Sequence, residues 1–277
     1  MFKYALCASP GAALHEPVLF RESFEKLFPR AKELGYDGVE IHLRDAADVD
    51  AEHLACLSEE SGVMVAAIAT GLAKRVDGLC LINPDEKERR RAIERLHGHI
   101  KLAEKFGCPV IIGSMRGNLP AGEAGRDSYK LLEASIKELA LFMKDRNCSI
   151  AFEAINRYEN NYLNTAAEAE KFLKQVGSEK VGMMLDTFHM NIEETDMCAA
   201  LWEHRNSLIH VHLADNTRLF PGSGTIDFKA LLRTLRQCGY DGWLSMEYLP
   251  GPDEETAAGE GIEYMRRLEK TADIVKM

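Results

Sequence analysis

The chain has 277 residues, 46% of them hydrophobic, and a net charge of −10. This is enough for one large core, and the acidic balance argues against nucleic acid as a partner, since nucleic-acid binding needs a basic surface. No apolar run approaches the roughly 20 residues that span a membrane, and no secretory signal opens the chain, so we expect a cytoplasmic protein with no membrane partner. Seven dispersed cysteines without a CxxC pair also suit a reducing compartment.

Short runs typical of strands alternate with helical periodicities along the chain. The expected strands are 2–7, 38–43, 63–70, 109–114, 149–153, 181–186, 208–213 and 243–248. Helices are expected at 86–106, 126–146, 166–176 and 228–238, with 254–277 as the closing helix, and helix ends are expected at Gly35, Gly107 and Gly239. This order predicts an α/β protein with a single (β/α)₈ TIM barrel domain over 1–277. A doubly wound open sheet is the main rival, but no GxGxxG follows the first strand.

Four consecutive predicted strands end in side chains that can bind a metal ion, namely Glu153, Asp186, His212 and Glu247. Side chains alternate between the two faces of a strand, and in these strands the apolar set suits the helix ring while the polar set faces the barrel interior. The four should therefore meet at the C-terminal mouth, where barrel enzymes hold their active sites. Three carboxylates and one imidazole favour one divalent ion, Mn²⁺ first and Mg²⁺ or Co²⁺ as alternatives. His210 lies one layer deeper, where a structural role is expected.

The same segments resemble the sugar isomerase/epimerase superfamily with a xylose-isomerase-like barrel, and within it the D-tagatose 3-epimerase group. The matching motifs are FEAINRYE at 152–159, LDTFHMNIEE at 185–194, HVHL at 210–213 with NTR at 216–218, and GYDG at 239–242 before Glu247. The resemblance implies metal ligation by the four residues above and substrate contacts from His189 and Arg218, with Glu159 supporting the catalytic end. It also implies a sugar or sugar-acid substrate and a homo-oligomer, either a dimer or a tetramer.

The N-terminal half is most similar to the 5-keto-L-gluconate epimerases. The stretches that carry this likeness are GYDGVEI at 35–41, ATG at 69–71, VDGL at 76–79 and VIIGSMRG at 110–117. Arg116 follows the fourth strand and is expected to face the mouth, where its guanidinium could hold a substrate carboxylate. The alternative is an ion pair inside the barrel, with Glu40 or Glu153 as the partner.

The predicted chemistry is proton transfer at a carbon next to a carbonyl, through an enediolate. Epimerisation needs a proton removed from one face and returned on the other, and Glu153 and Glu247 are the expected acid/base pair. The expected substrate is 5-keto-L-gluconate or D-tagaturonate. Alternatives are a ketose 3-epimerase on neutral sugars such as D-tagatose, D-psicose or L-ribulose, and a hydroxypyruvate-type aldose–ketose isomerase. A sugar-binding barrel without activity is less favoured because the ligand set is intact, and a DNA-repair endonuclease would need further histidines and a basic face.

Overall fold

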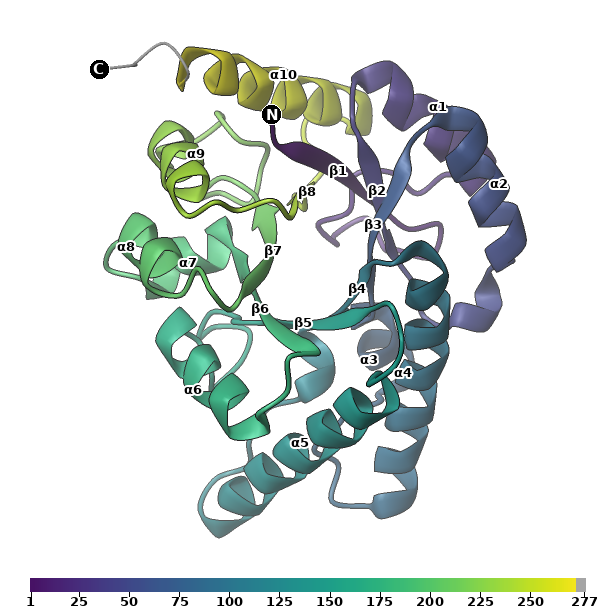
Figure 1. Ribbon diagram of the computed structural model, residues 1–277, viewed down its shortest axis with the longest axis vertical. Helices are drawn as coiled ribbons and strands as arrows, with labels where there is room; N and C mark the ends of the chain where they lie inside the picture. Colours follow the sequence, from purple (N-terminus) through teal and green to yellow (C-terminus); the bar gives the residue numbers. More distant parts are fainter. Residues whose placement is uncertain (273–277) are drawn as a thin grey trace.

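Eight parallel strands close into a barrel in chain order in the computed structural model, which describes residues 1–272 (Figure 1). The strands are β1 (Lys3–Ala8), β2 (Gly38–His42), β3 (Met64–Ala69), β4 (Pro109–Ile112), β5 (Ser149–Glu153), β6 (Val181–Asp186), β7 (Leu208–Leu213) and β8 (Trp243–Met246). The predicted TIM barrel is confirmed, and the strands at 149–153, 181–186 and 208–213 have the predicted bounds.

Helices surround the barrel on the outside (Figure 1). They are α1 (Phe24–Leu34), α2 (Ala51–Ser61), α3 (Gly71–Asp77), α4 (Glu86–Phe106), α5 (Glu123–Phe142), α6 (Ala166–Val176), α7 (Thr187–Glu193), α8 (Met197–Glu203), α9 (Phe228–Gln237) and α10 (Glu254–Ala272), with 3₁₀ turns η1 (Ala46–Asp48) and η2 (Ser114–Arg116). Residues 273–277 of the expected closing helix lie outside the described residues. Between residues 1 and 272, no helix combines the length and apolar character needed to cross a bilayer.

The helix ends follow from backbone chemistry that the sequence already displays. Gly35 and Gly107 end α1 and α4 in the left-handed conformation, at φ 88° and 63°, and Gly239 follows α9 at φ 70°. Residues with a Cβ are strained in this region, whereas glycine is not. Each of these helices therefore ends where the chain must turn back toward the next strand.

Side chains alternate between the interior and the helix layer as predicted. Ile150 and Phe152 of β5 belong to the main core between strands and helices. Ala151, on the other face of β5, packs with Ala67, Ile111 and Met184 in a separate small cluster. Because Glu153 shares the face of Ala151, the alternation directs its carboxylate to the barrel interior.

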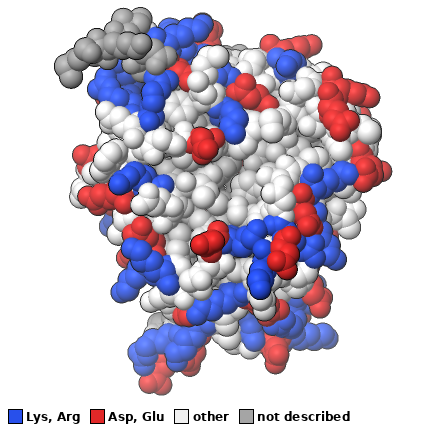
Figure 2. All heavy atoms as spheres, in the orientation of Figure 1, with Lys and Arg blue, Asp and Glu red and all other residues white. Residues whose placement is uncertain are grey.

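The surface carries charges of both signs. Figure 2 shows lysine and arginine interspersed with aspartate and glutamate around the periphery of one face, while uncharged residues cover much of its centre. Many of these charges are paired along or between helices, as in the contact of Arg90 with Glu138 and that of Lys137 with Glu133. The surface pairs contribute little to stability individually.

Candidate active site

The four predicted metal-binding side chains meet at the C-terminal mouth of the barrel. One ligand atom each from Glu153, Asp186 and His212 lies within 4.8 Å of the others. His212 Nδ1 is 3.2 Å from Glu247 Oε2 and 4.0 Å from Asp186 Oδ2. Asp186 and His212 are fully buried, and Glu153 and Glu247 are largely so. The structure thus brings together three carboxylates and one imidazole from β5, β6, β7 and the end of β8.

Asp186 is held by the helix that follows it. Its Oδ1 accepts a hydrogen bond from the backbone N–H of Phe188 at 2.8 Å, so Asp186 is the N-cap of α7. Capping satisfies one of the free N–H groups of the first helical turn and fixes the side chain. Oδ2 is thereby left directed at the site. The same helix carries His189 one turn from the strand end.

His212 is oriented by a buried carboxylate from the opposite side of the barrel. Glu40 of β2 accepts hydrogen bonds from Nε2 of His212 at 2.9–3.0 Å, of His210 at 2.8 Å and of His42 at 2.9 Å. Burial opposes ionisation of Glu40, but the three imidazoles outweigh it and hold its pKa well below its usual range. An ionised carboxylate only accepts, so the Nε2 atom of His212 carries the proton. This leaves Nδ1 as the nitrogen that faces the site.

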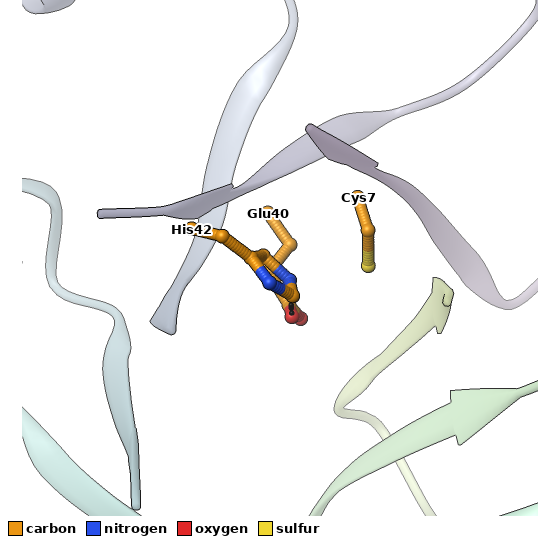
Figure 3. A group of neighbouring side chains, drawn as sticks. All are labelled: Cys7, Glu40 and His42. Atoms are coloured by element: carbon orange, nitrogen blue, oxygen red, sulfur yellow. Dashed lines mark hydrogen bonds and ion pairs between the residues drawn. The ribbon is translucent and has the colours of Figure 1, made fainter. Parts of the chain in front are cut away.

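The Cys7 thiol of β1 lies beside Glu40 and His42, whose side-chain ends meet (Figure 3). Burial, together with the Glu40 carboxylate, raises the pKa of Cys7 well above its usual range, so the thiol stays protonated. Glu40 directs its oxygens at the imidazoles. Within this group, Glu40 supports the predicted ligand His212 from behind.

The residues at the mouth fit a divalent cation. His212 Nδ1 is buried and has no hydrogen-bond partner, although three carboxylates surround it. Burial opposes protonation of His212, but Glu40 and Glu247 hold its pKa well above the usual range, because the surrounding carboxylates favour positive charge on this ring. A carboxylate that positions the far nitrogen of a ligating histidine is a common second layer around metal sites. Carboxylate oxygens and one imidazole suit Mn²⁺, Mg²⁺ or Co²⁺.

Glu153 is packed against a glycine and a histidine. A Cβ on Gly113 would lie 2.0 Å from Glu153 Oε2, so the carboxylate occupies the space that any larger residue would need. His189 Nε2 lies 3.4 Å from Glu153 Oε1, and His189 Nδ1 is 2.7 Å from Asn156 Nδ2. The Asn156 amide also donates to Glu159 Oε1 at 2.9 Å. The Glu159 side chain is more exposed than those of Glu153 and His189, which agrees with a position at the entrance of the site.

Arg218 lies across the site. Its guanidinium pairs with Asp186 through Nη1 and with Glu247 through Nη2, and it lies over the Phe188 ring at 4.8 Å. Its backbone has φ 61°, an unusual conformation for a residue other than glycine. The buried Asp215 holds the surrounding loop, because its carboxylate accepts from the backbone N–H groups of residues 216, 222, 224 and 226. Arg218 is therefore placed at the mouth by an ordered loop.

A cavity of about 150 Å³ opens between these side chains. Its walls come from the C-terminal ends of the eight strands and the segments that follow them. They consist of Pro17, His42, Ala69, Thr70, Gly71, Ile111, Gly113, Ser114, Glu153, Ile155, Glu159, His189, His212, Arg218 and Glu247. Seven of the eight predicted site residues are thus brought together, six in the cavity wall and Asp186 just behind it.

The structure does not bring Arg116 to the cavity. Its fully buried guanidinium lies near the rings of Phe152 and Tyr162, and Nη1 donates to the backbone carbonyls of Glu153 and Leu163 at 2.8 and 3.2 Å. No carboxylate between residues 1 and 272 pairs with this guanidinium, so the alternative of an ion pair with Glu40 or Glu153 is also corrected; the contact with Glu153 is to its backbone carbonyl. Burial lowers its pKa to about 10. The reason is the turn η2, which redirects the chain after β4, so strand alternation no longer applies at Arg116.

Sequence reasoning missed three contributors to the site. Glu40 was considered only as a partner for Arg116, although its inward place on β2 could have been found by the same alternation that identified Glu153. Asn156 lies within a recognised motif and links His189 to Glu159. The role of Gly113 depends on close approach between β4 and β5, for which a single sequence carries no signal.

Comparison with known proteins identifies the family. A model described as the xylose isomerase-like TIM barrel matches residues 28–268. The chain belongs to this family. L-ribulose 3-epimerase from Mesorhizobium japonicum is 32% identical over 229 residues, which cover 82% of this chain and 76% of that protein. The 3-dehydro-D-guloside 4-epimerase of Escherichia coli is 29% identical over 256 residues, or 89% of this chain and 95% of that one. A solved L-ribulose 3-epimerase structure has a TM-score of 0.81 at 26% identity and covers 100% of this chain and 99% of its own.

These findings confirm the resemblance and the expected enzyme class, an isomerase of the carbohydrate epimerase type. The named relatives differ in the carbon that they epimerise, carbon 3 in one case and carbon 4 in the other. Family membership therefore indicates the type of chemistry, and the site itself must indicate the substrate.

Proposed function

We propose that this protein is a metal-dependent epimerase that inverts a carbon next to the carbonyl group of a sugar. The observation that carries the proposal is the convergence of Glu153, Asp186, Glu247 and the buried Nδ1 of His212 at the barrel mouth. These four residues would hold one divalent ion, with Mn²⁺ as the first choice. When bound, such an ion withdraws electron density from the carbonyl oxygen and acidifies the neighbouring C–H bond.

Glu247 and Glu153 are proposed to move the proton. Burial opposes ionisation of Glu247, but His212 and Arg218 outweigh it and hold its pKa well below the usual range, so Glu247 is present as the carboxylate, the form that accepts a proton. In one direction Glu247 takes the proton from carbon and Glu153, in its protonated form, delivers one to the other face. In the reverse direction the two exchange roles. They belong to β5 and β8, three strands apart around the ring, so they can approach a substrate from different sides.

His189 and Arg218 are proposed to bind the substrate oxygens. Burial disfavours protonation of His189, but Asp186 and Glu153 more than compensate and raise its pKa, which favours the protonated ring as a hydrogen-bond donor. Arg218 remains charged between Asp186 and Glu247. Donors placed in advance stabilise the negative charge that develops on oxygen during proton removal. Glu159 is proposed to keep Asn156 and His189 in place at the entrance.

For the substrate we propose a neutral keto sugar. The preference for 5-keto-L-gluconate or D-tagaturonate depended on Arg116 at the mouth, and that residue lies elsewhere. Among the described residues that line the cavity, Arg218 is the sole lysine or arginine, and two carboxylates already pair with it. A substrate carboxylate would therefore meet three carboxylates and no lysine or arginine side chain of the cavity wall that is free to pair with it. The neutral ketose alternative agrees with the L-ribulose 3-epimerase relative.

A substrate panel tests this function. The enzyme is supplied with Mn²⁺ in D₂O, and neutral ketoses are compared with keto-hexuronic acids by NMR. We expect inversion of neutral sugars with deuterium incorporated at the inverted carbon. An aldose product would indicate the isomerase alternative, and inversion without exchange would contradict proton transfer between two carboxylates and solvent.

The metal ligands are tested separately by Asp186→Asn. We expect this variant to lose metal affinity and turnover together, because one of three negative charges around His212 Nδ1 is removed. Glu153→Gln and Glu247→Gln should also abolish inversion, and their metal content must be measured alongside. Full metal content with normal turnover in Asp186→Asn would contradict the site.

A further inference from the structure

We propose that the substrate carries an apolar substituent, as in a keto-glycoside with an aryl or alkyl aglycone, and that this group occupies a second cavity beside the mouth. This inference rests on the proposed epimerase function and names its substrate class. The second cavity measures about 420 Å³ and is lined by Ser9, Pro10, Gly11, Phe24, His42, Leu43, Arg44, Asp48, Val49, Leu72 and Val76.

The first step of the argument is size. Cavities that enclose small ligands usually measure about 300–1,000 Å³. The mouth cavity, at about 150 Å³, falls below this range. A substrate larger than a simple sugar would extend beyond it. The second cavity is nearly three times as large and lies next to the mouth.

The second step is continuity between the two cavities. His42 lines both of them, and its Nε2 atom is hydrogen-bonded to Glu40, the carboxylate behind His212. Gly71 and Leu72 are consecutive residues of α3, and the first lines the mouth while the second lines the neighbouring cavity. The two cavities therefore adjoin at His42 and the start of α3, and in the proposed complex the substituent of the sugar extends past these residues into the second cavity.

The third step is the chemistry of the walls. Six of the lining residues are apolar, namely Pro10, Phe24, Leu43, Val49, Leu72 and Val76. The polar ones are already engaged: Arg44 pairs with Asp77 at 2.7 Å, Asp48 accepts from the Asp45 backbone at 3.2 Å, and Ser9 accepts from the Gly11 backbone at 3.3 Å.

The chemistry of the walls decides whether the polar chain of a sugar or an apolar substituent fits the second cavity better. The hydroxyl-bearing chain of a free ketose would lose water in this cavity and find few partners, which is unfavourable. An aryl or alkyl group gains from the same transfer, roughly 25 cal/mol for each Å² buried. The cavity therefore fits an aglycone better than the polar tail of a ketose.

The experiment compares phenyl and methyl 3-ketoglucosides, with free D-psicose as the unsubstituted sugar. For the Mn²⁺-loaded wild type we expect kcat/KM at least ~10-fold higher for the phenyl than for the methyl compound, mainly through KM, because the phenyl ring buries apolar area. Leu72→Trp fills the cavity and should remove this preference. Val49→Trp fills the cavity from another wall and should also remove the preference. This second variant replaces Leu72→Trp if that variant folds poorly. Leu141→Trp makes the same exchange on α5, away from both cavities, and should keep the preference.

The outcomes separate the two proposals. If the wild type inverts D-psicose or the methyl compound but shows no preference for the phenyl compound, the second cavity is not an aglycone site and the epimerase function stands. The same conclusion follows if the preference for the phenyl compound survives in both Leu72→Trp and Val49→Trp. If the wild type inverts no sugar, the proposed function fails, and the cavity is then tested by calorimetric binding of phenyl glucoside. Binding that is lost in Leu72→Trp and kept in Leu141→Trp still supports the aglycone site. Equal binding to these two variants overturns the aglycone site.

Discussion

Glu40 shows how one buried residue can orient a proposed metal ligand, His212. It accepts from three imidazoles, and its contact with Nε2 directs Nδ1 of His212 to the site. Glu40→Gln should lower metal affinity and turnover by about 10- to 100-fold. Glu269→Gln is the control, because Glu269 is equally buried but bonds the Phe2 backbone in a different part of the molecule. Unchanged metal affinity in Glu40→Gln, measured by titration, would contradict the positioning role.

A substitution at Gly113 tests the position of Glu153, the carboxylate proposed to be catalytic. An alanine Cβ would stand 2.0 Å from Glu153 Oε2, the mobile end of a side chain, so the carboxylate can move aside with little loss of stability. We expect kcat to fall by about 100-fold, the effect of a misplacement of ~1 Å, with little change in Tm. Gly98→Ala on α4 meets its nearest atom at 3.5 Å and should leave kcat unchanged. Normal kcat in Gly113→Ala would show that Glu153 is not positioned by this contact.

At the level of elements, the loop after β7 depends on Asp215. The carboxylate accepts four backbone N–H bonds, and the Asp215 carbonyl accepts from the Arg218 N–H at 2.9 Å. Asp215→Ala leaves several of these donors without a partner and should lower stability by about 3 kcal/mol and kcat by ~10-fold, since Arg218 is no longer held at φ 61°. Asp227→Ala removes the N-cap of α9 and should lower stability by about 1 kcal/mol at normal kcat. Equal kcat values in the two variants would contradict the role of the loop.

A second interaction between elements depends on pH. Asp77 at the end of α3 accepts hydrogen bonds from Arg44, which follows β2, and from Arg95 of α4, and these lower its pKa from 3.8 to about 2. Because the folded-state pKa is depressed, the stabilisation is present above about pH 4 and is lost as the pH falls toward 2. The Arg44 side chain is half exposed, so about 1 kcal/mol is expected rather than the full value of the shift.

Urea unfolding at several pH values measures this interaction. Asp77→Asn should be about 1 kcal/mol less stable than the wild type at pH 7, and the difference should shrink as the pH falls below 4. A difference that stays constant between pH 7 and pH 3 would mean that the side chain acts through packing and not through its charge.

For the whole molecule, metal binding should couple to folding. Three carboxylates meet around His212 with Arg218 as their one arginine partner, and only the folded barrel assembles them. Chelation should therefore abolish turnover and lower Tm, and Mn²⁺ at about 100 times its Kd should restore about 2.7 kcal/mol of stability. Asp186→Asn is the control and should show a much smaller Tm response. A Tm that is insensitive to chelator and to Mn²⁺ would contradict a resident metal. The homo-oligomer and the cytoplasmic location remain predictions.

The sequence by itself determined the barrel and the place of its chemistry. Eight strand patterns separated by helices lead to one parallel barrel, and strict alternation along a strand identifies which of Phe152 and Glu153 faces the interior. Since the C-terminal ends of parallel strands meet at one rim, Glu153, Asp186 and His212 could be placed together before any coordinates were known.

Only the tertiary structure decided which groups meet across the barrel and beyond the strand ends. Glu40 and His212 belong to β2 and β7, which are not neighbours, so their contact depends on barrel closure and not on local pattern. Arg116 lies one turn past β4, where η2 changes the direction of the chain, and its side chain turned to Phe152 and Tyr162 instead of the mouth. The cavity beside His42 is likewise formed by loops whose packing no alternation rule describes, and for this reason the substrate, unlike the site, could be argued only from the folded molecule.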